Sequence, residues 1–146
     1  MNRFIFRVES DNQQGMGHFY RCLALAKILD GYKRSFLMSE YQAHLASILN
    51  SSNIKLEILN SKSPFFANAN ELANHIDVKD IVILDGYHFD ESYMKVLKNI
   101  SAGLVVIDDL NKGKYLADII INHGPHAKNI KYNTLHKTKF LLGEEY

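Results

Sequence analysis

The sequence predicts a doubly wound α/β fold with a mainly parallel, Rossmann-like sheet. Short apolar runs rich in β-branched or aromatic residues alternate along the chain with longer segments of helical pattern. Several runs, such as Ile81–Leu84, are continuously apolar, which is typical of strands buried on both faces of a parallel sheet. Regular alternation of strands and helices predicts right-handed crossovers between parallel strands. With 146 residues, the chain is expected to form one domain, 1–146.

The expected elements follow one another without a repeat or a low-complexity linker. The predicted strands are Arg3–Val8, Ser35–Ser39, Ile54–Leu59, Ile81–Leu84, Leu104–Asp108, Ile119–Asn122 and Phe140–Leu142. The predicted helices are Gly17–Leu29, Glu40–Leu49, Asn68–Ile76 and Asp90–Asn99. Asp90 stands where an N-cap is expected, because its carboxylate can accept from the free N–H groups of the first turn. Cys22 lies in an apolar stretch and is expected to be a small core residue.

The composition argues against several classes of protein. The formal net charge is +1 and the basic residues are dispersed, so no phosphate-backbone footprint for a nucleic acid is expected. The apolar run near the N-terminus is far shorter than that of a signal peptide, and no stretch reaches the roughly 20 apolar residues that span a bilayer. A single cysteine fits a reducing compartment. We therefore expect a cytoplasmic protein that binds neither nucleic acid nor a membrane.

Polar and ionisable residues follow four of the predicted strands. In open parallel sheets, ligands bind beyond the carboxyl ends of the strands, at the point where the strand order reverses. These strand ends are therefore expected to form a ligand site. The four clusters are Glu9-Ser10-Asp11, Asp85-Gly86-Tyr87-His88, Asp108-Asp109 and Asn122-His123-Gly124.

The segment Gly15-Met16-Gly17-His18 joins the first predicted strand to the first helix. Glycines permit a tight turn close to a ligand, and the free N–H groups of a helix start suit phosphate or a developing oxyanion. The positive end of the helix dipole disfavours imidazolium, which keeps the His18 ring neutral and available as a base. A dinucleotide fingerprint would need a third glycine at Tyr20, and the lysine of a Walker loop is missing. The alternative is a helix start whose glycines serve only the turn.

The stretch from Gly15 to Ala26 resembles the hydrolases of pseudaminic acid biosynthesis that act on UDP-2,4-diacetamido-2,4,6-trideoxy-β-L-altropyranose, and is similar also to spore-coat polysaccharide proteins. Further matches follow in order at Leu84–Asp90, Val106–Asp109, Ala117–Asp118, Ile121–His123 and Phe140–Gly143. The resemblance implies a GT-B fold, in which two Rossmann-like halves face each other across a cleft. The chain resembles the N-terminal half, so the C-terminal half that binds most of the UDP is expected to be absent from it.

The resemblance also implies a reaction and roles for individual residues. In this family, water displaces UDP from the anomeric carbon of the sugar, without a metal or cofactor. His18 matches the base that orients the water, and Tyr87 matches a tyrosine of the same cleft. The residues expected to bind substrate are Gly15, Met16, Gly17, Arg21, Asp85 and Asp109. For the two aspartates, capping of nearby N–H groups is an equally good interpretation. Arg21 is slightly favoured as a structural partner of Asp11 or Asp85.

Other functions stay open at this point. The nearest alternative to the hydrolase is the acceptor-binding half of a GT-B glycosyltransferase, and a third possibility is a nucleotide-sugar-binding domain without catalysis. A metal site formed by His88, His123 and His126 is not expected, because Gly124-Pro125 breaks any helix and no carboxylate or cysteine pattern completes the ligand set. Without a UDP-binding half, this chain is expected to bind the UDP-sugar weakly and to hydrolyse little of it.

Overall fold

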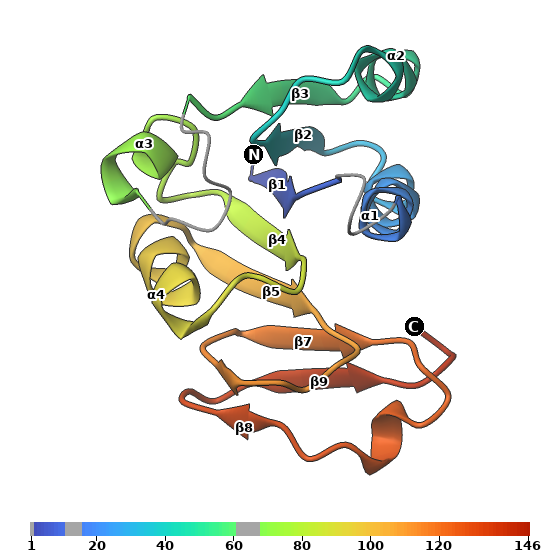
Figure 1. Cartoon of the computed structure of the whole chain (residues 1–146), viewed down its shortest axis with the longest axis vertical. Helices are drawn as coiled ribbons and strands as arrows, with labels where there is room; N and C mark the ends of the chain where they lie inside the picture. Colours follow the sequence, from blue (N-terminus) through green and yellow to red (C-terminus); the bar gives the residue numbers. More distant parts are fainter. Residues whose placement is uncertain (1, 11–15, 61–67) are drawn as a thin grey trace.

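The computed structural model describes residues 2–10, 16–60 and 68–146. Their main sheet is parallel and lies between two layers of helices (Figure 1). The sheet has seven strands in the order β3-β2-β1-β4-β5-β7-β9, and every paired neighbour is parallel. The strands are β1 (Arg3–Val8), β2 (Lys33–Met38), β3 (Lys55–Ile58), β4 (Ile81–Asp85), β5 (Gly103–Ile107), β7 (Ile119–Asn122) and β9 (Lys139–Leu142). The predicted doubly wound α/β fold is confirmed.

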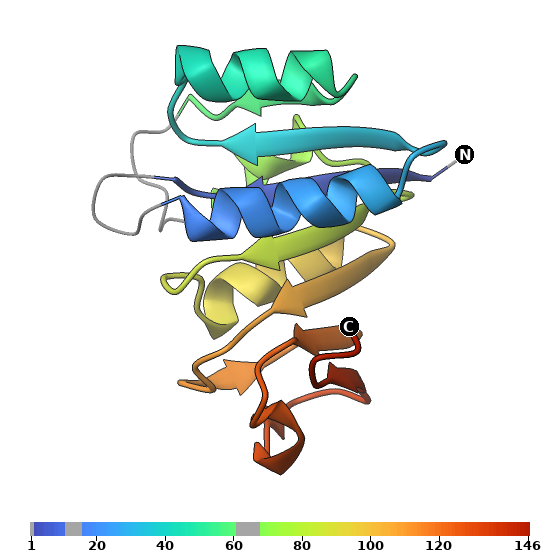
Figure 2. The same cartoon turned by 90° about the vertical axis from the view of Figure 1, so that its right-hand side faces the viewer.

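Two helices cover each face of the sheet. Helices α1 (Gly17–Ile28) and α2 (Ala43–Ser51) lie over β1, β2 and β3 in Figure 2, and α3 (Ala69–Ala73) and α4 (Glu91–Ile100) lie on the opposite face. Phe19 and Cys22 of α1 are fully buried in one hydrophobic cluster, and Leu97 of α4 is fully buried in the other. The predicted N-cap at Asp90 is confirmed, because its carboxylate accepts from the Tyr93 N–H at 2.9 Å.

The strand order reverses between β1 and β4. From β1 the chain moves outward to β2 and β3, and it returns to the other side of β1 to form β4, β5, β7 and β9. The carboxyl ends of β1 and β4 therefore diverge into loops that lead to helices on opposite faces of the sheet. This topological switch point is where open α/β sheets bind their ligands.

Several element boundaries differ from the predicted ones for local reasons. Helix α2 starts at Ala43 because Gln42 is still extended, and α3 starts after Asn68, whose side chain accepts from the Glu71 N–H at 3.1 Å. The structure adds elements too short to give a periodic signal. These are β6 (Lys114–Tyr115) and β8 (Asn133–Thr134), which pair in parallel with each other, and the 3-10 turn Ala127–Asn129.

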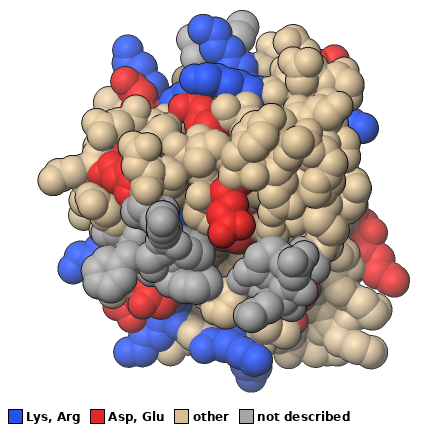
Figure 3. Space-filling model, turned by 45° about the horizontal axis from the view of Figure 1, so that its top comes forward, with Lys and Arg blue, Asp and Glu red and all other residues tan. Residues whose placement is uncertain are grey.

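The surface carries charges of both signs. On the face in Figure 3, basic and acidic side chains are scattered among uncharged ones, with acidic atoms near the centre of the view as well as toward its edges. The chain as a whole has a formal net charge of +1. Among the helices of the described residues, none combines the length and the apolar character that crossing a membrane requires.

Candidate functional site at the sheet switch point

An ion-paired cluster lies at the switch point, where the start of α1 meets the end of β4. The Nδ1 atom of His18 is 2.7 Å from Oδ1 of Asp85. Arg21 donates to the same carboxylate twice, from Nε to Oδ2 at 2.8 Å and from Nη2 to Oδ1 at 2.6 Å. His18 and Arg21 are three residues apart on α1 and so share one helix face. One carboxylate from β4 thus anchors both side chains of α1.

Asp85 is ionised in this setting. Its side chain is fully buried, and burial by itself raises the pKa of the carboxyl. The hydrogen bonds from His18 and Arg21, together with the positive charge of Arg21, outweigh that effect, so the pKa of Asp85 is lower than its ordinary value. An ionised carboxylate only accepts hydrogen bonds, so Nδ1 of His18 carries the hydrogen in this contact. In the neutral ring, the lone pair is then on Nε2.

Tyr87 and Asp109 border the same cluster from the loops after β4 and β5. The Tyr87 ring contacts the His18 ring edge to face, with ring centroids 4.5 Å apart. Its hydroxyl donates to Oδ2 of Asp109 at 3.3 Å, and Arg21 donates from Nη1 to the same oxygen at 3.2 Å. Partial burial and the nearby Asp109 carboxylate raise the pKa of the Tyr87 phenol, which therefore remains a hydrogen-bond donor at neutral pH.

These side chains border an open pocket at the carboxyl edge of the sheet. We call it the His18 pocket, and its lining residues are Gly17, His18, Arg21, Tyr87, Asp109 and His123. The His18 side chain is only 5% exposed, so the imidazole meets the pocket with one edge while its Nδ1 side is turned to Asp85. Tyr87, by contrast, is 50% exposed and accessible to a ligand. The pocket thus combines a largely buried imidazole that is paired with Asp85 and an exposed phenol that donates to Asp109.

His123 lines the pocket; the sequence analysis placed it in a strand-end cluster and weighed it as a metal ligand, but did not name it among the binding residues. It follows β7, and the buried Asn122 before it holds the turn by accepting from the Gly124 N–H at 2.9 Å and donating to the Tyr132 hydroxyl at 2.8 Å. The signal that could have identified His123 is its position in one of the four strand-end clusters.

The glycine-rich segment contributes less to the pocket than expected. Gly15 lies outside the described residues. Met16 does not line the His18 pocket but packs against the hydrophobic cluster under α1, and its sulfur accepts from the Ser10 hydroxyl at 2.9 Å. Gly17 does line the pocket, and a Cβ atom there would meet no heavy atom within 4 Å. The space at Gly17 is therefore open to a ligand.

A second buried ion pair lies beneath the loop that carries Tyr87. Arg7 is 0% exposed, forms an ion pair with Glu9, and donates from Nε to the Tyr93 hydroxyl at 2.7 Å. Its guanidinium also lies 4.9 Å from the centroid of the Phe89 ring. Because Phe89 follows Tyr87 in the loop after β4, this contact ties the base of that loop to β1.

Gly86 is required at the start of the same loop. Its φ of +155° is unusual for other residues, and a Cβ atom there would lie 2.8 Å from the Phe89 ring. A side chain at this position would therefore displace Phe89 or the loop itself.

The chemistry available to this site is acid–base chemistry. Within the described residues, no three side chains of histidine, cysteine, aspartate or glutamate gather in a way that could hold a metal ion. Arg21 already faces two carboxylates, those of Asp85 and Asp109, so its charge is compensated inside the protein. The arrangement offers a base at His18 and polar groups at Tyr87 and Asp109, with little net positive charge for a phosphate.

The fold and the site together define a doubly wound α/β protein with an anchored histidine at its switch point. No family model matches the sequence. Among curated proteins, the uncharacterized protein MJ1062 of Methanocaldococcus jannaschii is 31% identical over 141 residues, an alignment that covers 92% of this chain and 28% of that relative. The chain therefore corresponds to little more than a quarter of the relative's length.

Proposed function

We propose that this chain is the N-terminal half of a nucleotide-sugar hydrolase that releases UDP from UDP-2,4-diacetamido-2,4,6-trideoxy-β-L-altropyranose. The observation that carries the proposal is the pairing of His18 with the buried Asp85 at the sheet switch point, beside the exposed Tyr87. The choice of this substrate rests on the resemblance of the Gly15–Ala26 stretch and of the later strand-end segments to the hydrolase family.

In the proposed reaction, His18 acts as the general base. Asp85 holds the hydrogen on Nδ1, so Nε2 accepts a proton from a water molecule as that water attacks the anomeric carbon of the sugar. The bond between this carbon and the UDP oxygen breaks on the opposite face, and UDP leaves with the electron pair. The transition state has oxocarbenium character. The ionised Asp85 stabilises the imidazolium that forms, which then releases its proton to solvent.

The remaining pocket residues position the sugar. The Tyr87 hydroxyl and the Asp109 carboxylate lie together at the pocket wall and are suited to bind the attacking water or a polar substituent of the sugar. The leaving diphosphate needs cations or free N–H groups. Since the charge of Arg21 is compensated by Asp85 and Asp109, we assign diphosphate binding mainly to a C-terminal half.

The test is an assay of UDP release in H2¹⁸O, with the chain joined to its C-terminal half. We expect ¹⁸O in the sugar and none in UDP.

His18→Gln is expected to lower the rate by about 10²- to 10⁴-fold, the usual contribution of a general base. His126→Gln, at an exposed histidine outside the pocket, is the matched control and should leave the rate unchanged. Equal UDP release by His18→Gln and the parent would refute the proposal. Glycosyl transfer to an added sugar instead of water would identify a glycosyltransferase.

A further inference from the structure

His123 differs from the other polar side chains that line the His18 pocket, because those are all paired within the protein. The pairs are His18 with Asp85, Arg21 with Asp85 and Asp109, and Tyr87 with Asp109. His123 is exposed, and it forms no hydrogen bond or ion pair with any residue that the structure describes. Both nitrogens of its ring are therefore available to a ligand in this pocket.

The main chain that carries His123 is held on both sides of the residue. Asn122 precedes it at the end of β7, and the carbonyl oxygen of Asn122 accepts from the Gly143 N–H at 2.9 Å. Gly124 follows it and donates its own N–H to the Asn122 side chain. Because this strand end is already ordered, it gives up little freedom when a ligand binds to His123.

The two sides of the pocket differ in charge. Asp85 and Asp109 lie beside Arg21 and compensate its positive charge. His123 belongs instead to the segment 119–143, which contains four lysines and three histidines but no aspartate or glutamate. Glu145, just after this segment, is paired with Lys128 at 2.7 Å. An anionic part of a ligand is therefore favoured on the β7 side of the pocket.

The proposed reaction requires an anion-binding group across the pocket from His18. Water activated by His18 attacks one face of the anomeric carbon, so the phosphate leaves from the opposite face. Arg21 and Tyr87 do not meet this requirement, because both contact His18 itself. The end of β7 is two strands from that of β4, which is about 10 Å along the sheet edge at the usual strand spacing. A pocket of about 490 Å³ accommodates a sugar and its phosphate over this distance.

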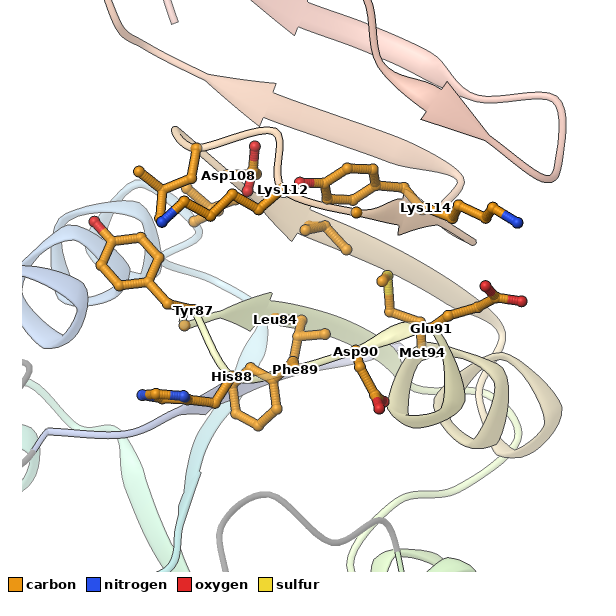
Figure 4. A pocket seen from close by; sticks show the side chains of 16 residues that line it. Leu84, Tyr87, His88, Phe89, Asp90, Glu91, Met94, Asp108, Lys112 and Lys114 are labelled. Carbon is orange, nitrogen blue, oxygen red and sulfur yellow. The ribbon is translucent and has the colours of Figure 1, made fainter.

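Other cations near this edge of the sheet lie outside the pocket. Lys112 and Lys114 line a different cavity, between the loops that follow β4 and β5 (Figure 4), and neither lines the His18 pocket. Lys128 and His126 do not line it either. Among the described residues, His123 is thus the basic side chain that the β7 side contributes to the pocket.

We propose that His123 binds the diphosphate of the ligand whose sugar is held at His18. A neutral imidazole donates one hydrogen bond to a phosphate oxygen, and an imidazolium donates up to two and adds a positive charge. The inference rests on the proposed function for the position of the sugar. It adds a diphosphate contact from this chain to those assigned to the C-terminal half, and it directs the nucleotide end of the ligand toward β7.

The ring signals of His18 and His123 report on the two sides of the pocket separately, by NMR of the 146-residue protein labelled at its histidines. The ligands are UDP-N-acetylglucosamine, UDP and inorganic pyrophosphate, at matched millimolar concentrations and constant ionic strength. We expect UDP-N-acetylglucosamine to shift both rings. UDP and pyrophosphate should shift His123 and leave His126 nearly unchanged.

The outcomes separate this inference from the proposed function. A shift at His18 without one at His123 in UDP-N-acetylglucosamine would overturn the diphosphate contact and leave the proposed function standing. A shift at His123 in all three ligands without one at His18 would refute the proposed function, while the diphosphate contact stands. A response of His123 to UDP but not to pyrophosphate would indicate recognition of the nucleoside and would also overturn the inference.

Substitutions of the exposed His123 provide a second test. His123→Ala should raise the Kd of pyrophosphate by about 10-fold, the usual effect of losing a hydrogen bond to a charged group. His123→Arg keeps a donor and a positive charge and should bind pyrophosphate at least as tightly as the parent. His126→Ala is the matched control, because it removes a histidine of the same segment outside the pocket. An unchanged Kd in His123→Ala, or an equal loss in His126→Ala, would contradict a specific contact at His123.

Discussion

The imidazole Nδ1 of His18 lies 2.7 Å from the carboxylate Oδ1 of Asp85, although the two residues are 67 positions apart in the sequence. The contact exists because β4 pairs directly with β1, which brings the end of β4 to the start of α1. Asp85 has no accessible surface of its own, so its carboxylate acts on a ligand only through His18 and Arg21. Asp85 is therefore a positioning residue. Its replacement should act first on the tautomer of the His18 ring.

Asp85→Asn tests this role. An amide no longer requires the hydrogen on Nδ1 and cannot stabilise imidazolium, so UDP release by the two-domain protein should fall by about 10²- to 10⁴-fold, as in catalytic triads. ¹⁵N chemical shifts of the His18 ring should show the hydrogen redistributed between the two nitrogens. Asp118→Asn is the control, because Asp118 pairs with Lys98 away from the pocket. A folded Asp85→Asn variant with parental activity and an unchanged tautomer would contradict the assignment.

Acid should destabilise the protein through the same carboxylate. Although burial by itself raises the pKa of Asp85, the contacts with His18 and Arg21 outweigh it and lower the pKa in the folded state. The folded state then holds this proton less tightly than the unfolded chain, whose aspartates titrate near pH 3.9. The stability contributed by Asp85 is therefore fully present above that pH and is lost as the pH falls through the lower folded-state value.

The measurement is the urea midpoint at pH 6, 4 and 3 for the parent and Asp85→Asn. Glu57 and Asp118 also have lowered pKa values, where hydrogen bonds and nearby cations outweigh burial, so part of the acid sensitivity should persist in the variant. Its midpoint should nevertheless fall less with acid than that of the parent. Parallel decreases for the two proteins would argue against a lowered pKa at Asp85.

Arg7→Met should be strongly destabilising. Arg7 and Glu9 are a buried pair, and removing one partner leaves the other charge without compensation, at a cost of about 3–5 kcal/mol. The double variant Arg7→Met/Glu9→Gln should recover part of this loss in urea unfolding. Arg3→Met is the matched control, because Arg3 pairs with Glu57 and Asp80 at a partly exposed position and should cost less. If Arg3→Met and Arg7→Met lowered the free energy of unfolding equally, burial of the Arg7–Glu9 pair would not explain the cost of its loss.

Cys22 should be unreactive in the folded protein. Burial, together with the nearby Asp85 carboxylate, raises the pKa of its thiol well above the ordinary value, so little thiolate forms at pH 8. A thiol reagent such as Ellman's reagent should react slowly in buffer and at once in denaturant. Fast reaction under native conditions would show that α1 opens readily.

The sequence predicted the fold, and it brought several residues of the candidate site together, because both inferences depend on local patterns. Continuous apolar strands identified the parallel sheet, and the strand-end rule grouped Asp85, Tyr87 and Asp109 with the His18 loop. The network of Arg7 was not predicted, because its partner Tyr93 is 86 positions away and an arginine inside a strand gives no periodic signal. Met16 was expected in the site, yet spacing within a loop does not determine which side chains face a ligand.

The strand order also constrains the path by which the protein forms. Strand β1 precedes the other strands of the sheet in the sequence but lies in its interior, between β2 and β4. The edge of β1 that pairs with β4, where Phe4 lies opposite Ile81, is covered only after Ile81 has been synthesised. Contacts so distant in sequence close slowly. During translation, β1, β2 and β3 can pair with one another, while the unsatisfied edge of β1 stays open to other chains until β4 emerges from the ribosome.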